Sequence, residues 1–222
     1  MEILSQSAYK KLIYGAQSLS HDTIDGKISH KVLRLEDQSI LKLFRVKHLI
    51  SSTRLFPYVK RFRNNADRLA ALDIPTVQVS AIYRIPSIKR TAVHYHPLDG
   101  ITLRDHGIRT PIDDTLSNKL GFFLYVLHRS GVYFRSIHFG NIVLTSDNHI
   151  GLIDVADMRF SKGPLTTARR IRNLRHLFRH HTDAEMLAPV SECFLDTYCR
   201  HAHLNRHREK RFRRHFNSYL IS

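Results

Sequence analysis

Three residues in this chain of 222 residues have types and spacing suited to binding a nucleoside triphosphate with Mg²⁺. Lys42 lies in the apolar run "SILKLFR", Asn141 ends the loop "SIHFGN", and Asp154 follows the apolar run "IGLI". Phosphoryl transfer needs a cation on a rigid strand to hold the phosphates. Mg²⁺ prefers oxygen ligands such as carboxylates and amides. The three side chains therefore suit phosphate and magnesium binding.

Two predicted hairpins would position these side chains. The segments "IVLTS" and "IGLIDV" are apolar and flank the turn "DNH", which predicts a hairpin with Asn141 and Asp154 at the same end. Alternating apolar residues around "EDQS" predict another hairpin, with strands near 31–35 and 39–46. Its second strand carries Lys42.

The remaining patterns predict an α+β chain with two lobes. Residues 1–97 read as a small, mostly antiparallel sheet with one helix between 53 and 72. Residues 98–222 read as helical, with a helix that Asp114 or Thr115 caps and Gly131 stops. Later helices begin near Leu165 and in the basic tail. We place the boundary between the lobes at 97–100.

The composition favours an anionic partner. Lys and Arg total 35 against 19 Asp and Glu, for a net charge of +16, which suits nucleic acid, an anionic membrane or a phosphorylated substrate.

No apolar run approaches the roughly 20 residues of a spanning helix, and the N-terminus lacks the pattern of a signal peptide. We expect reduced thiols at Cys193 and Cys199, and a cytoplasmic location, with peripheral contact with the inner membrane.

The stretch "LHRSGVYFRSIHFGNIVL", with "IGLIDVADMRF" after it, resembles the catalytic segment of protein-kinase-like phosphotransferases. The similarity is strongest to bacterial lipopolysaccharide core (heptose) kinases and to the small toluene-tolerance proteins of the same group. "ILKLFR", "RLAALDIPT" and "HYHPLDGITLRD" are similar to their lysine strand, the end of their adjacent helix and their hinge. The resemblance covers residues 30–180 and implies a two-lobed kinase-like fold.

The resemblance also implies roles for individual residues and an activity. Lys42 would contact the α and β phosphates of ATP, Asn141 and Asp154 would hold Mg²⁺, and backbone groups from His96 to Leu98 would meet the adenine. The implied activity is ATP-dependent phosphorylation of a sugar of the lipopolysaccharide core or a related glycolipid.

The chain departs from the family pattern at four places. The position of the catalytic base holds Ser136 instead of aspartate, so Asp157 or His138 would have to accept the proton. The helix between 53 and 72 has no glutamate to pair with Lys42, leaving only Asn64, Asn65 or Asp67 as weak substitutes. Gly26 is the only glycine of the expected nucleotide-covering loop, and Ala156 replaces the glycine of the metal motif.

Other interpretations remain open at this point. Lys42 could be an ordinary edge-strand lysine, Asn141 a turn cap, and Asp154 the N-cap of the next turn. The chain could be an impaired pseudokinase that binds nucleotide or anionic glycolipid and supports envelope assembly or solvent tolerance. We expect no metal site among the clustered histidines and no nucleic-acid interface, since the basic helices carry few aromatic residues.

Overall fold

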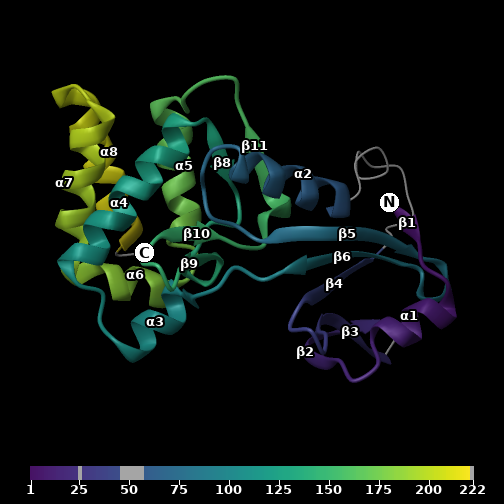
Figure 1. Ribbon diagram of the computed structural model, residues 1–222. Helices are drawn as coiled ribbons and strands as arrows, with labels where there is room; N and C mark the ends of the chain where they lie inside the picture. The colour runs from purple at the N-terminus through teal and green to yellow at the C-terminus, as the bar shows by residue number, and fades with distance from the viewer. Residues whose placement is uncertain (25–26, 46–57, 221–222) are drawn as a thin grey trace. The chain divides into compact units, whose positions relative to one another are not determined.

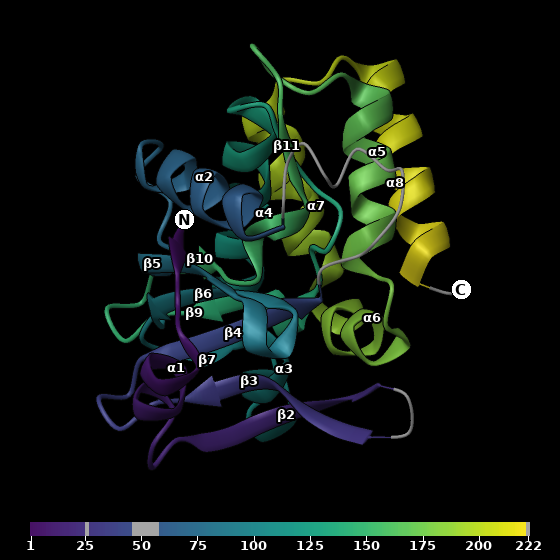
Figure 2. The same ribbon diagram turned by 90° about the vertical axis from the view of Figure 1, so that its right-hand side faces the viewer.

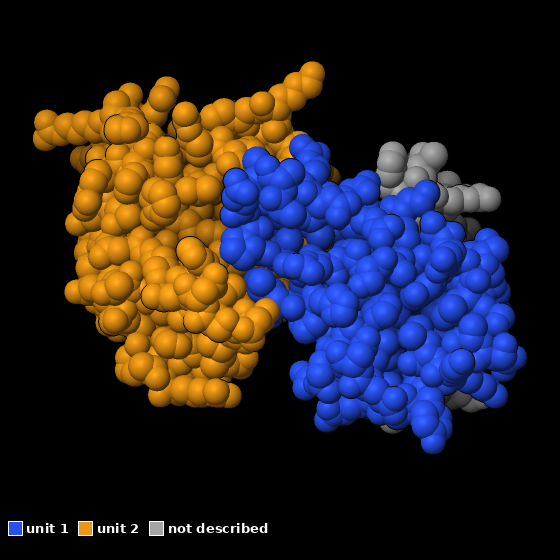
Figure 3. Space-filling view, viewed as in Figure 1, with its two compact units in different colours: residues 1–98 blue, residues 99–222 orange. Residues whose placement is uncertain are grey.

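The computed structural model describes residues 1–24, 27–45 and 58–220 of a mixed α/β protein. The chain divides into two compact units, residues 1–98 and 99–222 (Figure 3). This division lies within the boundary of 97–100 that the sequence predicts. Along the described part of the chain, no helix combines the length and apolar character needed to cross a membrane.

Unit 1 is built on one six-stranded sheet. Its strands are β1 (Glu2–Ile3), β2 (Gln17–Ile24), β3 (Lys27–Arg34), β4 (Ile40–Arg45), β5 (Gln78–Ile85) and β6 (Arg90–His96). Their order is β1-β5-β6-β4-β3-β2, and all neighbours are antiparallel except β1 and β5 (Figure 1). The predicted antiparallel character is confirmed, and β4 is an internal strand.

Two helices cover opposite faces of this sheet. Tyr9 of α1 (Gln6–Leu12) packs in the cluster that contains Leu41, whereas Tyr58 of α2 (Tyr58–Ala70) stacks on Phe44 with ring centroids 6.1 Å apart. Side chains alternate along a strand, so Lys42 shares the face of Phe44, on the side of α2.

The prediction of a single helix in this unit is wrong. Helix α1 is short, and its N-cap is Ser5, whose hydroxyl accepts the N–H of Ala8 at 3.2 Å. A helix of two turns gains its stability from packing rather than from local propensity, so its sequence pattern is weak. Gly26 and the predicted helix residues 53–57 lie outside the described residues.

Unit 2 combines helices with two small sheets (Figure 2). One sheet holds β7 (Ile101–Thr102), β9 (Ile142–Leu144) and β10 (Ile150–Leu152), and the other pairs β8 (Val132–Phe134) with β11 (Met158–Phe160). The helices are α3 (Leu103–Arg109), α4 (Asp114–Arg129), α5 (Thr167–Leu177), α6 (His181–Leu187), α7 (Ser191–Ala202) and α8 (Arg206–Leu220). Short 3₁₀ turns occupy Phe139–Asn141, Val155–Asp157 and Ala188–Val190.

Helix α4 is the centre of this unit. Its N-cap is Asp113, whose carboxylate accepts the N–H of Leu116 at 2.7 Å, so the predicted caps Asp114 and Thr115 are wrong by one or two residues. The helix ends at Ser130, and Gly131 follows with φ of +75°, as the sequence predicts. A Cβ at Gly121 would lie 2.5 Å from the carbonyl oxygen of Phe194, so glycine lets α4 approach the backbone of α7.

A buried polar network connects α4 to its neighbours. The ring of His128 meets the hydroxyl of Tyr198 through Nδ1 at 2.7 Å and the amide oxygen of Asn173 through Nε2 at 3.2 Å. The amide nitrogen of Asn173 donates to the carbonyl of Phe134 at 2.8 Å. Helices α4, α5 and α7 are therefore fixed to the end of β8, from which the loop 135–141 departs.

Candidate functional site

The predicted hairpin between Asn141 and Asp154 is present. Strands β9 and β10 pair antiparallel, with Ile142 opposite Leu152. The N–H of Ile153 donates to the carbonyl of Asn141 at 3.0 Å and extends the ladder by one step. Asn141 and Asp154 consequently leave the hairpin at the same end.

The amide of Asn141 has a defined orientation. Its Nδ2 atom donates to the carbonyl of Ser136 at 2.9 Å and lies 3.2 Å from Nε2 of His138. Both hydrogens of the amide are thereby used inside the loop. Asn141 does brace the turn, and this bracing leaves its Oδ1 oxygen with no hydrogen bond to any described residue.

Asp154 lies in a left-handed backbone conformation. Its φ is +54° and its ψ is +44°, and its side chain makes no capping hydrogen bond to the 3₁₀ turn that follows. Asp154 therefore occupies the N-cap position of this turn without capping it through its side chain. A residue other than glycine in this region costs on the order of 1 kcal/mol, and such residues concentrate at functional sites.

His138 connects the loop to its charged surroundings. Burial lowers the pKa of its imidazole, and the nearby charges of Arg104 and His180 lower it further, against the raising effect of Asp183 and Asp154. The ring is therefore neutral near pH 7. Its Nδ1 atom is buried and has no hydrogen-bond partner within the described residues.

An ion pair that sequence analysis missed fixes the loop from the other side. The guanidinium of Arg104 in α3 binds the fully buried Asp183 of α6 through Nε at 2.8 Å and Nη2 at 2.9 Å. Asp183 also accepts the backbone N–H of Phe139 at 2.9 Å. Neither residue belongs to a local pattern, because the two lie 79 positions apart and only the fold brings them together.

The two other catalytic candidates occupy different surroundings. Ser136 is half-buried in the loop, and its hydroxyl has no hydrogen-bond partner within the described ranges. Asp157 accepts the N–H of Arg135 through its carbonyl at 3.1 Å, and its carboxylate lies 3.8 Å from Arg135 Nη1. The structure thus groups Asp157 with Arg135 rather than with His138.

The candidates of unit 1 lie on and after its central strands. Lys42 is half-buried on β4 between Val32 of β3 and Val93 of β6, so it is not an edge-strand lysine. Its Nζ lies 5.8 Å from the ring centroid of Phe44. His96 is exposed at the end of β6, and Leu98 is half-buried as the last residue of the unit.

The helix facing Lys42 offers little in place of the missing glutamate. In α2, Asn64 and Asp67 are exposed, and Asn65 is buried. Of the three residues predicted to replace the glutamate that pairs with Lys42, Asn65 alone is buried.

A magnesium ion would find a minimal oxygen set at the end of the hairpin. The described part of the chain contains no group of three or more His, Cys, Asp or Glu side chains that could hold a metal. Mg²⁺, however, commonly takes one or two protein ligands and completes its shell with water and phosphate oxygens. The Oδ1 of Asn141 and the carboxylate of Asp154 fit that mode, since the amide orientation leaves Oδ1 available.

Comparison with known proteins assigns the chain to no family. No model of a known protein family matches the chain, and no curated protein is significantly similar to it.

Proposed function

We propose that the protein is an ATP-dependent phosphotransferase with a two-lobed, protein-kinase-like fold. Its acceptor is a sugar of the lipopolysaccharide core or a related glycolipid, and its place of action is the cytoplasmic face of the inner membrane. The acceptor follows from the sequence resemblance alone, because a fold does not fix a substrate.

The observation that carries the proposal is the hairpin end that holds Asn141 and Asp154. Both residues lie at the same end of β9 and β10, and the loop uses the amide hydrogens of Asn141, which leaves its Oδ1 for another partner. Carboxylate and amide oxygens are ligands of the kind that a nucleotide-bound Mg²⁺ requires. The sheet of unit 1 supports the proposal further, since it supplies Lys42 on an internal strand.

Each residue has a role in this proposal. Lys42 binds the α and β phosphates, and the backbone from His96 to Leu98 binds the adenine. Asn141 and Asp154 hold Mg²⁺, which when bound neutralises charge on the phosphates. His138 holds Asn141 through its Nε2 atom and keeps the loop in shape.

Ser136 favours a second candidate, a pseudokinase that binds nucleotide or anionic glycolipid without turnover. A serine hydroxyl does not act as a base near neutral pH without help, and Asp157 lies beside Arg135 rather than at the hairpin end. Neutral His138 uses Nε2 as the acceptor from Asn141, which leaves Nδ1 protonated and unable to take a proton. The loose transition state of phosphoryl transfer asks little of a base, so the active enzyme remains our first proposal.

Nucleotide binding is the direct test of both candidates. ATP with Mg²⁺ should raise the melting temperature of the wild type, because a ligand that binds only the native state stabilises it. Lys42→Ala and Asp154→Ala should abolish both this shift and phosphotransfer. No thermal shift in the wild type, or full activity in either variant, would refute the assigned roles.

Detection of the product separates the enzyme from the pseudokinase. ³¹P spectra of lipopolysaccharide core from cells with and without the protein should differ by one phosphate signal if turnover occurs. Ser136→Asp should raise the rate if a base limits it. Nucleotide binding with no phosphate signal would support the pseudokinase.

A further inference from the structure

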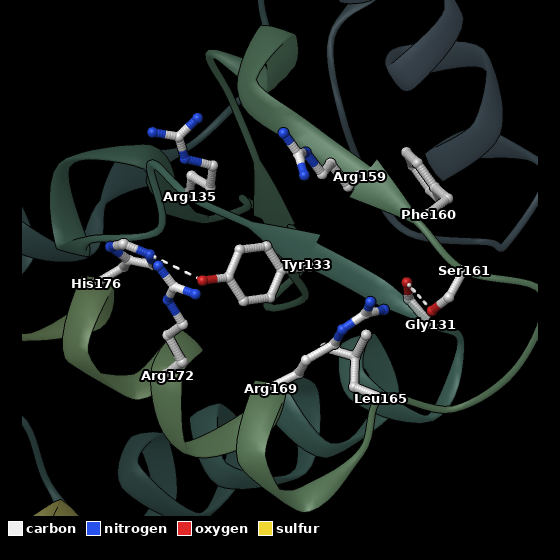
Figure 4. A pocket seen from close by; sticks show the side chains of 10 residues that line it. All are labelled: Gly131, Tyr133, Arg135, Arg159, Phe160, Ser161, Leu165, Arg169, Arg172 and His176. Atoms are coloured by element: carbon white, nitrogen blue, oxygen red, sulfur yellow. Dashed lines mark hydrogen bonds between the residues drawn. The ribbon is translucent and has the colours of Figure 1, made fainter.

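A basic cavity of unit 2 lies beside the loop that starts at Arg135. The cavity has a volume of about 650 Å³, within the range of small-molecule sites. Arg135 lines it from the start of the loop, Arg159 from β11, and Arg169, Arg172 and His176 from α5 (Figure 4). Tyr133 stands among these side chains, and its hydroxyl points toward His176.

Four arginines meet here with little to balance their charge. None of the described residues that line the cavity carries a carboxylate. Among the described residues, the one ion pair of these arginines is the contact between Arg135 and Asp157 at 3.8 Å, and the guanidinium groups of Arg159, Arg169 and Arg172 have no carboxylate partner. Like charges repel, and α5 adds no acidic residue in its first turn. An anion bound in the cavity would relieve this repulsion.

The positive charge of the cavity also acts on His176. Its Nε2 lies 3.0 Å from the hydroxyl of Tyr133. Burial lowers the pKa of His176, and Arg135, Arg172, Arg179 and Arg175 lower it further, in that order. The cavity therefore combines guanidinium donors, a phenol and a neutral imidazole. Guanidinium groups match the geometry of phosphate oxygens through paired hydrogen bonds.

We propose that this cavity, the Arg pocket, binds a phosphate group that the acceptor already carries. The inference rests on the proposed function and adds to it that the acceptor is a phosphorylated sugar or glycolipid. Arg135 immediately precedes Ser136, so a phosphate held in the Arg pocket would anchor the acceptor next to the loop 136–141. The phosphate that the acceptor already carries then binds the acceptor to the protein. It is a different group from the phosphate that is transferred from ATP.

A pair of charge variants tests the Arg pocket. Arg159→Gln with Arg172→Gln removes one guanidinium from each wall. Arg208→Gln with Arg211→Gln removes the same charge from exposed positions outside the cavity. The pocket variant should bind the phosphate probes about tenfold more weakly than the wild type, because charge-assisted hydrogen bonds are lost, whereas the control should stay within about twofold. Equal losses in the two variants would overturn the proposal.

Two probes distinguish the source of the phosphate. Glucose 1-phosphate represents a soluble sugar phosphate, and phosphatidylcholine vesicles containing phosphatidic acid represent a phosphate monoester on a lipid. Pocket-dependent binding of either one supports the proposal and identifies its source. Displacement of the probe by a duplex oligonucleotide or by ATP with Mg²⁺ would overturn it, since the cavity would then be a nucleic-acid or nucleotide site.

A measurement on the wild type needs no variant. A phosphate near His176 favours its charged form, so inorganic phosphate should raise the pKa of His176 in an NMR titration. An unchanged pKa at saturating phosphate would overturn the proposal. The pocket variant should also retain the thermal shift with ATP and Mg²⁺. Absence of that thermal shift in the wild type would instead refute the proposed function. Failure of the Arg pocket proposal and failure of the proposed function therefore give different results.

Discussion

At the scale of single residues, Arg104 and Asp183 fix the loop 135–141 from outside, whereas Asn141 braces it from within. Asp183 holds the N–H of Phe139, and Arg104 holds Asp183 with two hydrogen bonds. The two charges act on His138 in opposite directions, because the guanidinium lowers the pKa of the imidazole and the carboxylate raises it. They are positioning residues, since neither is proposed to touch the nucleotide.

Substitution of the two partners should therefore shift the same histidine in opposite directions. Asp183→Asn should lower the pKa of His138 further, and Arg104→Gln should raise it, as an NMR pH titration of the ring would show. Asp183→Asn should also cost about 2 kcal/mol in the free energy of unfolding, because it leaves a partly buried guanidinium unpaired. Shifts of the same sign would contradict this electrostatic assignment.

His128 makes the stability of the protein sensitive to acid. Burial lowers its pKa from 6.5 to about 3. The unfolded chain therefore binds a proton at this position more readily between those values, and the stability present above pH 6.5 falls as the pH drops toward 3. We expect a loss of about 1.4 kcal/mol per pH unit from this residue in urea denaturation. His128→Gln should be less stable at pH 7 but should show a shallower slope, and an equal slope would contradict the assignment.

The sequence predicted part of the candidate site and could not predict the rest. Asn141 and Asp154 could be placed together because one short hairpin joins them. Arg104, Asp183 and the Arg pocket could not be found, since they come from segments that are distant in the chain. Asp183 follows two histidines and a threonine in "HHTDAEM", with no spacing that would indicate its burial.

At the scale of elements, prediction depended on the strength of the local pattern. Helix α4 was predicted from its cap and its glycine stop, and α8 from its basic sequence. Helix α5 was predicted from apolar residues at helical spacing, and Ile171, Leu174 and Leu177 are indeed buried. Helices α1 and α6 were missed, since each has 7 residues and obtains its stability from packing. Helix α7 was also missed. It nevertheless packs closely on α4, because Gly121 of α4 lies against the backbone of Phe194.

The contact between α4 and α7 has a direct test in Gly121→Ala. The new methyl group would lie 2.5 Å from the carbonyl oxygen of Phe194, so the helices must separate. We expect a loss of about 2 kcal/mol in chemical denaturation, because overpacking outweighs the better helix propensity of alanine. Gly163→Ala is the matched control, since nothing lies within 4 Å of its Cβ position. If Gly121→Ala were as stable as this control, the close approach would be refuted.

At the scale of the whole molecule, ion pairs cannot cancel the net charge of +16, because Lys and Arg outnumber Asp and Glu by 35 to 19. Helix α8 illustrates this excess. Arg213 is paired with Glu192, Asp196 and Glu209, and burial of Phe212 and Phe216 fixes the helix to its unit. Its other arginines, Arg206, Arg208, Arg211 and Arg214, are exposed. A surface of this kind attracts anionic membranes, with about 1 kcal/mol for each basic residue near the lipid.

Association with an anionic membrane should consequently be electrostatic and sensitive to salt. We expect the protein to sediment with phosphatidylglycerol vesicles at low ionic strength and to be released near 1 M salt, where the screening length falls to about 3 Å. Replacement of the four exposed arginines of α8 by glutamine should weaken retention, while neutral phosphatidylcholine vesicles should retain neither protein. Binding that survives high salt would contradict this expectation, because it would require insertion of apolar side chains into the lipid.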